Sequence, residues 1–229
     1  LANPISSSTT LIEQLSNLLS GFKNRPVAFI ASDEYLDFYV NNSKFFNDNF
    51  YNSIADSEVI SKIQDKLEQY KIVKKLDIPV PKTLAFNGDL TKLSFKNFRF
   101  PAIIKARDVN LWRNKVSGIK KGFSVNSKGK LLKYLQYFKM KKVPIIIQEI
   151  IKSSDKDNVK FCTFSYNGQI SFFLLSKIHQ YPINFGIGSS VMSINDDNLE
   201  SLGKKLFNSI DYQGIASVEF KYDKRDNVY

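Results

Sequence analysis

The stretch Phe100-Pro-Ala-Ile-Ile-Lys105 decides how the rest of this sequence is interpreted. Pro101 opens the stretch, and three apolar residues follow it without a polar interruption. A short uninterrupted apolar run is typical of a strand that is buried on both faces of a sheet. Lys105 ends the run, and burial of its ammonium group is costly unless the group meets an anion, for which a phosphate is suited. Taken alone, the stretch also fits a lysine that reaches the surface along its aliphatic stem.

The composition predicts one large domain or two small ones. The chain has 229 residues, 43% of them hydrophobic and 14% aromatic, so it can bury a core of ordinary size. It begins at Leu1 and stops at Tyr229 within a strand-like pattern, so we expect it to be cut at both ends. No apolar run reaches the length of a membrane span, and we expect no membrane partner. The single cysteine, Cys162, forms no internal disulfide, which favours a cytoplasmic location.

The net charge of +11 predicts an anionic partner, which is a nucleic acid, a membrane surface or a nucleotide. However, only five of the 33 basic residues are arginines, and lysine, asparagine and isoleucine are abundant throughout. Such a composition is typical of a diffuse, solvated charge. We therefore expect the basic character to have a function only in residues 105–121.

The residues before the central stretch predict the end of an open α/β domain, followed by helices. A helix is expected over residues 9–22, a short buried strand over 26–30, and then a helix capped by Ser32 and Asp33. Residues 56–76 predict a helix in two pieces, with Lys66 near the break.

The residues after the central stretch predict a basic loop, then helices and strands in a regular order. Asn167-Gly168 is a strong signal for a hairpin between two strands. The expected segments are a loop over 106–122, a helix from Ser127, a buried strand over 144–151, hairpin strands over 159–166 and 169–176, a loop over 177–190, a helix over 196–210, and a strand over 214–222.

In this order the segments resemble the ATP-grasp superfamily, specifically its carboxylate–amine ligase branch with the D-aspartate ligase-like proteins. The resemblance runs from about Val27 to Tyr229 and rests on several motifs together, among them "DIPVPKT", "IIIQEII", "SKIHQYP" and "GIASVEFKYD". It implies an α/β and α+β fold class, namely an ATP-grasp fold with two lobes after a partial open α/β (pre-ATP-grasp) domain. The implied boundaries are 1–56 for the remnant of that domain and 57–229 for the ATP-grasp domain, with lobes of about 57–147 and 148–229.

The resemblance also implies a nucleotide site. Lys66 and Lys105 match lysines that meet the phosphates of ATP. In the hinge segment, Gln148 to Ile151, backbone groups of Glu149 and Ile151 would contact the adenine edge, and Ile150 would wall the ring. Asp157 is a candidate for the ribose hydroxyls, although the run around it is more often a solvated turn.

Further candidates follow from the phosphate lid, which the resemblance places in residues 106–122. The lid has only Gly118 and Gly122, so Lys120 or Lys121 is expected to grip phosphate in place of the backbone. Trp112 also fits the pattern, and its simpler interpretation is a local hydrophobic plug.

Lys177 and His179 match a segment that lines the acceptor and phosphate region, and His179 stands where an arginine is usual. Histidine cannot provide a bidentate fork and is mostly neutral at pH 7. Glu219 matches the first magnesium-binding carboxylate, and the second is expected just after Tyr229. Two other acids in this region, Asp223 and Asp226, are expected to face solvent.

The implied function is an ATP-dependent ligase that joins a small-molecule carboxylate to an amine through an acyl phosphate, with ATP and Mg²⁺. We expect the chain alone to be poorly active, because the second metal-binding acid is missing from it. Two alternatives stay open: an ATP-binding module without catalysis, and a basic nucleic-acid-binding protein.

Overall fold

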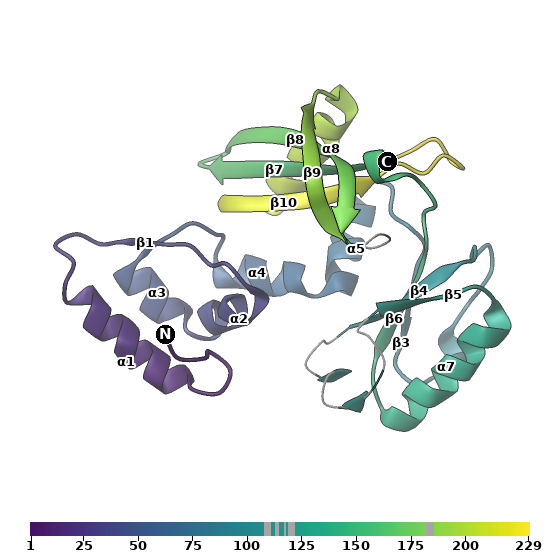
Figure 1. Cartoon of the computed structure of the whole chain (residues 1–229), viewed down its shortest axis with the longest axis horizontal. Coiled ribbons are helices and arrows are strands. Elements are labelled where there is room, and N and C mark those ends of the chain that lie inside the picture. Colours follow the sequence, from purple (N-terminus) through teal and green to yellow (C-terminus); the bar gives the residue numbers. More distant parts are fainter. Residues whose placement is uncertain (108–110, 113–114, 117, 119–121, 182–185) are drawn as a thin grey trace. The chain divides into compact units, whose positions relative to one another are not determined.

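The computed structural model describes residues 1–107, 111–112, 115–116, 118, 122–181 and 186–229. The chain forms two compact units (Figure 1). The first unit contains Leu1–Gln64 and Asp155–Phe220, and the second contains Asp65–Ser154 and Lys221–Tyr229. The domain boundaries implied by the sequence remain predictions. Within the described residues, no helix is both long and apolar enough to cross a membrane.

The second unit is built on an antiparallel sheet with the strand order β3-β6-β4-β5. Its elements are α5 (Lys66–Lys75), β3 (Thr83–Phe86), the short helix η1 (Leu90–Lys92), β4 (Ala102–Ala106), β5 (Gly122–Val125), α7 (Lys128–Lys141) and β6 (Ile145–Glu149). Ser127 caps α7 by accepting a hydrogen bond from the backbone N–H of Lys130, as the sequence predicts.

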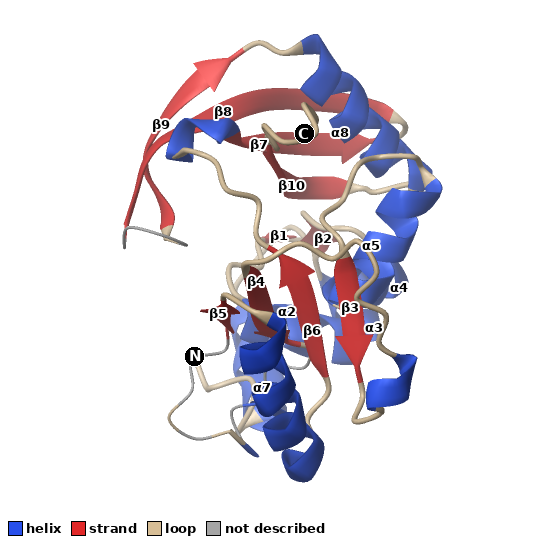
Figure 2. Ribbon diagram, turned by 90° about the vertical axis from the view of Figure 1, so that its right-hand side faces the viewer, coloured by secondary structure: helices blue, strands red, loops and turns tan. Residues whose placement is uncertain are grey.

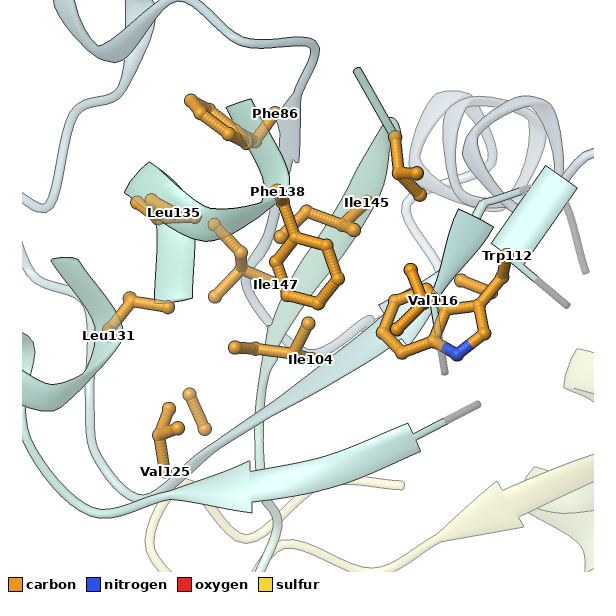
Figure 3. Packing of buried hydrophobic residues seen from close by; sticks show 13 residues of the cluster. Phe86, Ile104, Trp112, Val116, Val125, Leu131, Leu135, Phe138, Ile145 and Ile147 are labelled. Atoms are coloured by element: carbon orange, nitrogen blue, oxygen red, sulfur yellow. The ribbon is translucent and has the colours of Figure 1, made fainter. Parts of the chain in front are cut away.

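The core of this unit lies between the sheet and α7 (Figure 3). Leu131, Leu135 and Phe138 of α7 pack against alternate residues of the strands, such as Ile104 and Ile147. The burial of apolar area on this face is the main favourable contribution to the stability of the unit.

Only one of the two apolar stretches is buried on both faces. In β4 the buried residues alternate with partly exposed ones, so Ile103 and Lys105 lie on the face away from the core. The prediction that this strand is buried on both faces is therefore wrong. In β6, by contrast, all five residues are buried.

The first unit contains a sheet with the strand order β10-β7-β8-β9. Its strands are β7 (Asn158–Tyr166), β8 (Gln169–Tyr181), β9 (Ile187–Ile194) and β10 (Gly214–Lys221), and η2 (Asp155–Asp157) precedes β7. The hairpin between β7 and β8 turns at Asn167 and Gly168, which both have positive φ, and this confirms the predicted turn. The helix α8 (Asp197–Ser209) runs along one face of the sheet (Figure 2), where Gly203 lies against the ring of Phe161.

The loop predicted over residues 177–190 is wrong in large part. Residues 177–181 continue β8, and β9 begins at Ile187, so that Lys177 pairs with Val191. One proline and two glycines in this segment indicated a loop, but backbone pairing with the neighbouring strand extends the hairpin.

The remaining elements of the first unit come from the N-terminal residues. They are α1 (Ser8–Leu19), β1 (Val27–Ala28), α2 (Asp33–Asn41), α3 (Ser43–Asn49), β2 (Tyr51–Asn52) and α4 (Ser57–Gln64). The pair β1 and β2 is parallel, but Val27 and Phe29 are 53% and 68% exposed, so the predicted burial of this strand is wrong. The predicted break near Lys66 is confirmed, because Asp65 separates α4 from α5.

Candidate functional site

One face of the sheet in the second unit carries a chain of hydrogen bonds that ends at Lys105. Directly paired residues of antiparallel strands share a face, and Gln148 is paired with both Ile103 and Thr83. Lys105 lies two residues after Ile103, so it is on the same face as Gln148 and Thr83. The Nζ atom of Lys105 donates to Oε1 of Gln148 at 2.8 Å. The Nε2 atom of Gln148 donates to Oγ1 of Thr83 at 2.9 Å, and that hydroxyl donates to the carbonyl of Pro81 at 2.8 Å. The chain therefore fixes the amide of Gln148 with its oxygen toward Lys105.

The ammonium group of Lys105 lies in surroundings that disfavour its charge. Burial lowers the pKa of Lys105 to about 8, and the ammonium of Lys66 lowers it in the same direction. The hydrogen-bond partner of Lys105 is the uncharged amide of Gln148. A desolvated cation beside a second cation forms a place where a bound anion relieves an unfavourable free energy.

The position of Lys66 depends on an ion pair at the start of α5. Asp65 caps this helix through the N–H of Leu67 and accepts a hydrogen bond from Nη2 of Arg107 at 3.0 Å. Burial alone would raise the pKa of Asp65, but the hydrogen bonds from Arg107 and the backbone together lower it. Because Arg107 directly follows β4, the pair anchors the first turn of α5 to the end of the strand that carries Lys105.

Tyr70 is a further neighbour of this group. It lies one turn after Lys66 on α5, and its hydroxyl forms a hydrogen bond with Gln148. Burial raises the pKa of the Tyr70 phenol, and this hydrogen bond partly offsets the effect. The sequence-based predictions include neither Tyr70 nor Thr83, although the spacing of 66 and 70 on one helix face was a usable signal.

The side chain of Glu149 is occupied by the protein itself. It is 3% exposed, and its two oxygens accept from the backbone N–H of Arg99 at 2.9 Å and from Nε of Arg99 at 3.2 Å. Its backbone N–H donates to the carbonyl of Lys82 at 3.0 Å. Because this N–H is occupied, the predicted contact of Glu149 with an adenine edge would involve its carbonyl and not its N–H.

Arg99, the partner of Glu149, also forms an ion pair with the last residues of the chain. Arg99 donates to both oxygens of Asp226, at 3.1 and 2.5 Å, and Arg225 donates to Asp223. The Asp223 side chain is 7% exposed, and hydrogen bonds from Arg225 lower its pKa. The expectation that Asp223 faces solvent is therefore wrong, because its carboxylate is buried and pairs with Arg225. The expectation for Asp226 is confirmed, since its side chain is 48% exposed, although it also pairs with the distant Arg99.

The first unit brings together two of the predicted residues, Lys177 and Glu219. The Nζ atom of Lys177 lies 3.9 Å from Oε1 of Glu219, and Nζ of Lys160 lies 3.8 Å from the same oxygen. Lys177 is 12% exposed at its side chain, whereas Glu219 is 55% exposed. Burial raises the pKa of the neighbouring Cys162 thiol, which disfavours a reactive thiolate. The Glu219 carboxylate is thus accessible and is bordered by two cations.

No protein-family model matches the sequence. The chain is similar to the D-aspartate ligase of Enterococcus faecium (strain Aus0004), with 24% identity over 219 residues. The match covers 90% of this chain and 52% of that protein, so the chain spans about half the length of this curated relative.

Solved structures show the same arrangement of elements. D-alanine–D-alanine ligase from Bacillus anthracis, complexed with ATP, matches with a TM-score of 0.67 and 13% identity, over 96% of this chain and 68% of that chain. L-amino acid ligase from Bacillus licheniformis matches with a TM-score of 0.67 and 13% identity, over 98% of this chain and 52% of that chain. The chain has the ATP-grasp fold. The resemblance to the ATP-grasp superfamily and the fold class that it implies are thereby confirmed.

The structure also shows the surroundings of the remaining predicted site residues. Ile150 continues the hinge segment and donates its N–H to the carbonyl of Pro101 at 2.9 Å. Ile151 is partly buried, and Asp157 is the partly buried last residue of η2. His179 is exposed on β8, where the pairing with β9 is irregular. Their assigned roles, like those of the other site residues, stay predictions.

Two expectations for the ATP-grasp lid have different outcomes. Lys120 and Lys121 lie outside the described residues. Trp112 is 1% exposed, and its ring lies 4.8 Å from that of Phe138, centroid to centroid, within the hydrophobic core (Figure 3). This supports the simpler interpretation of Trp112 as a hydrophobic plug.

The residues also test whether an ATP-grasp magnesium site fits. Among the described residues there is no group of three or more histidines, cysteines or acids that could hold a metal. Mg²⁺ in nucleotide sites takes one or two carboxylates and completes its shell with phosphate oxygens and water. The exposed oxygen of Glu219 fits such a shared shell, and it does not fit a site made by the protein alone.

Proposed function

We propose that this chain binds ATP and takes part in the ATP-dependent joining of a carboxylate to an amine. The observation that carries the proposal is the desolvated ammonium of Lys105, held by Gln148 and Thr83 beside Lys66 on the sheet of an ATP-grasp fold. Buried cations need anions, and the phosphates of a nucleotide supply several negative charges at once. The names of the similar proteins, which are ligases for amino acids, support the reaction class.

In this proposal the second unit holds the nucleotide. Lys66 and Lys105 contact phosphate oxygens, and the carbonyl of Glu149 with the N–H of Ile151 contacts the adenine edge. Asp157 in the first unit is the candidate for the ribose. The remaining proposed nucleotide contacts are the side chain of Ile150 and the lid lysines Lys120 and Lys121, while Gln148 acts on the nucleotide through Lys105.

The proposed chemistry needs no covalent intermediate on the protein. A carboxylate oxygen of the substrate attacks the γ-phosphorus of ATP, the bond to the bridging oxygen breaks, and ADP leaves. The amine of the second substrate then attacks the acyl carbon, inorganic phosphate leaves, and the amide remains. Bound Mg²⁺, with Glu219 as one ligand, would supply neutralisation of charge on the phosphates. In this proposal Lys177 holds the negative charge of a substrate or phosphate, and His179 contacts the acceptor.

A second candidate function is an ATP-binding module without catalysis. Two observations favour it: His179 stands at a position where an arginine would provide a fork, and Glu219 already has two lysines within 4 Å. We keep the expectation that the chain alone is poorly active, together with its cytoplasmic location, as parts of the proposal. Nucleic-acid binding is less favoured, because the ammonium group of Lys105 is largely desolvated beside Gln148 and does not belong to a broad exposed basic surface.

The test is the release of ADP and phosphate from Mg·ATP, measured on this chain and on any longer protein that contains it. The assay uses a matrix of carboxylates and amines that includes D-amino acids. Ligase activity predicts that ADP formation needs one compound of each kind and yields an equal amount of amide. Binding of ATP without ADP formation in every cell of the matrix supports the non-catalytic module. No binding of ATP contradicts both.

A further inference from the structure

The net charge of the chain is concentrated in one segment. Residues 105–142 contain twelve of the 33 lysines and arginines and a single acid. The rest of the chain therefore has 21 basic and 21 acidic residues and is neutral. Six of the twelve are lysines within residues 128–142, which have no acid. Residues 105–121, which were expected to differ from a diffuse charge, carry about half of the excess. The other half lies on α7 and its C-cap, where the expectation of a diffuse charge is wrong.

The six lysines share the solvent-facing side of this helix. The opposite side of α7 is fixed in the core by Leu131, Leu135 and Phe138 (Figure 3). Two large side chains lie among the lysines, Met140 at 76% and Tyr134 at 36% exposure. We call this surface the α7 face, and its lysines are Lys128, Lys130, Lys133, Lys139, Lys141 and Lys142.

The lysines of the α7 face have no carboxylate partners within 4 Å among the residues that the structure describes. Lys128 and Lys141 lie over the rings of Phe95 and Tyr137. The carboxylate of Asp89 is a more distant neighbour of Lys139. Some lysines on other helices differ, since Lys44 of α3, Lys62 of α4 and Lys204 of α8 each pair with an acid one turn away.

Helix stability does not account for this distribution. Lys128 and Lys130 lie in the first turn of α7, where the helix dipole disfavours cations and favours acids. Helices α2 and α8 follow that preference, with Asp33 and Glu34 in α2 and Glu200 in α8. Helices α3 and α5 have one lysine each in the first turn, whereas α7 has two lysines and no acid there. Lysines at the start of α7 therefore indicate a requirement outside the helix.

We propose that the α7 face docks on the anionic surface of a lipid bilayer. Its lysines are spread over the exposed side of a helix of about 20 Å, and point charges distributed in this way suit a broad negative surface. The exposed Met140 and Tyr134 suit the boundary between headgroups and acyl chains. A peripheral contact of this kind needs no membrane-spanning helix, and it replaces the expectation that the chain has no membrane partner.

Two observations favour a bilayer over nucleic acid. The α7 face has no arginine, which is the side chain with the fork geometry for phosphates and base edges. It also lacks a row of aromatic side chains on which bases would stack, since Tyr134 is the one aromatic residue of α7 that is exposed. The face lies on the side of its sheet opposite Lys105, so docking leaves the proposed phosphate contacts uncovered.

The experiment measures sedimentation of the chain with vesicles of phosphatidylglycerol and phosphatidylcholine, compared with vesicles of phosphatidylcholine alone, at about 0.1 M salt. The test variant carries Lys130→Gln, Lys133→Gln and Lys141→Gln. The control variant carries Lys23→Gln, Lys75→Gln and Lys205→Gln, which removes three equally exposed charges elsewhere. Thermal midpoints of both variants verify that they are folded.

The proposal predicts binding to the anionic vesicles alone, weakened about a hundredfold in the test variant and little in the control. Met140→Ser should weaken it further at high salt, where the apolar contribution dominates. Absence of vesicle binding, or equal loss in both variants, overturns the proposal. Saturable binding of duplex DNA that is tighter than vesicle binding and is lost in the test variant overturns it in favour of a nucleic-acid surface.

Discussion

ATP binding should be coupled to protonation of Lys105. In the free protein the pKa of this lysine is about 8, because burial and the charge of Lys66 disfavour its ammonium form. Contact with a phosphate favours the ammonium form, so the pKa in the complex should return to at least its ordinary value of 10.5. The complex then holds a proton that part of the free protein lacks, and binding weakens as pH rises through 8.

The magnitude follows from the two pKa values. At pH 8 half of the free chains have a neutral Lys105, so ATP binding should take up about half a proton at this pH. Between pH 7.5 and pH 9 the Kd for Mg·ATP should rise about eightfold, since ATP itself has no further titration in this range. The stability of the free chain changes in the opposite sense. The folded pKa lies below the unfolded value, so the free energy of unfolding rises between pH 8 and 10.5 as the unfavourable burial of charge is removed.

Calorimetric titration with Mg·ATP in two buffers of different ionisation enthalpy measures the proton uptake. Lys105→Met is the matched variant, because it keeps the length of the side chain and removes the charge. It should remove the uptake and most of the affinity. The free variant should stay folded, since loss of the burial cost of about 3 kcal/mol offsets the unpaired amide of Gln148. A Kd that is constant from pH 7.5 to pH 9, with no proton uptake, would refute this reasoning.

Three further substitutions test the surroundings of the site and the fold. Thr83→Val removes the acceptor of the Gln148 amide, so it should weaken ATP binding by up to about tenfold with little change in thermal midpoint; an unchanged Kd in calorimetry would exclude a positioning role. Arg99→Ala leaves the buried Glu149 carboxylate without its main partner and should lower the urea midpoint clearly, whereas Asp226→Asn, at an exposed partner, should lower it little; equal effects would contradict this. Gly203→Ala puts a Cβ 2.3 Å from the Phe161 ring and should cost about 1–3 kcal/mol in urea denaturation, and no loss would show that the α8 contact is looser than described.

Local patterns in the sequence predicted the order of elements well. The break between α4 and α5, the cap at Ser127 and the turn at Asn167-Gly168 each depend on a few neighbouring residues, so the sequence contains the signal. The apolar run before Lys105 was also sufficient to locate a strand. Its second, half-open face was not predicted, because exposure depends on what covers the sheet.

Contacts between distant residues were out of reach of the same reasoning. Thr83 and Gln148 are 65 positions apart, and Arg99 and Glu149 are 50 apart. They meet because β3 and β4 flank β6 in a particular register, which is set by the packing of the whole sheet. Charge patterns also did not reveal the partner of Asp226, which lies in an exposed turn as predicted and pairs with Arg99, 127 positions away.

Competitive labelling of the lysine side chains with and without saturating Mg·ATP, quantified by mass spectrometry, tests the central claim most directly. The claim is that Lys66 and Lys105 face the phosphates of ATP. The account predicts that ATP lowers the labelling of both lysines, while Lys130 and Lys133 on the α7 face keep their labelling and serve as the internal reference. Labelling of Lys105 that saturating Mg·ATP leaves unchanged, or lowers only as much as that of Lys130, would contradict the account.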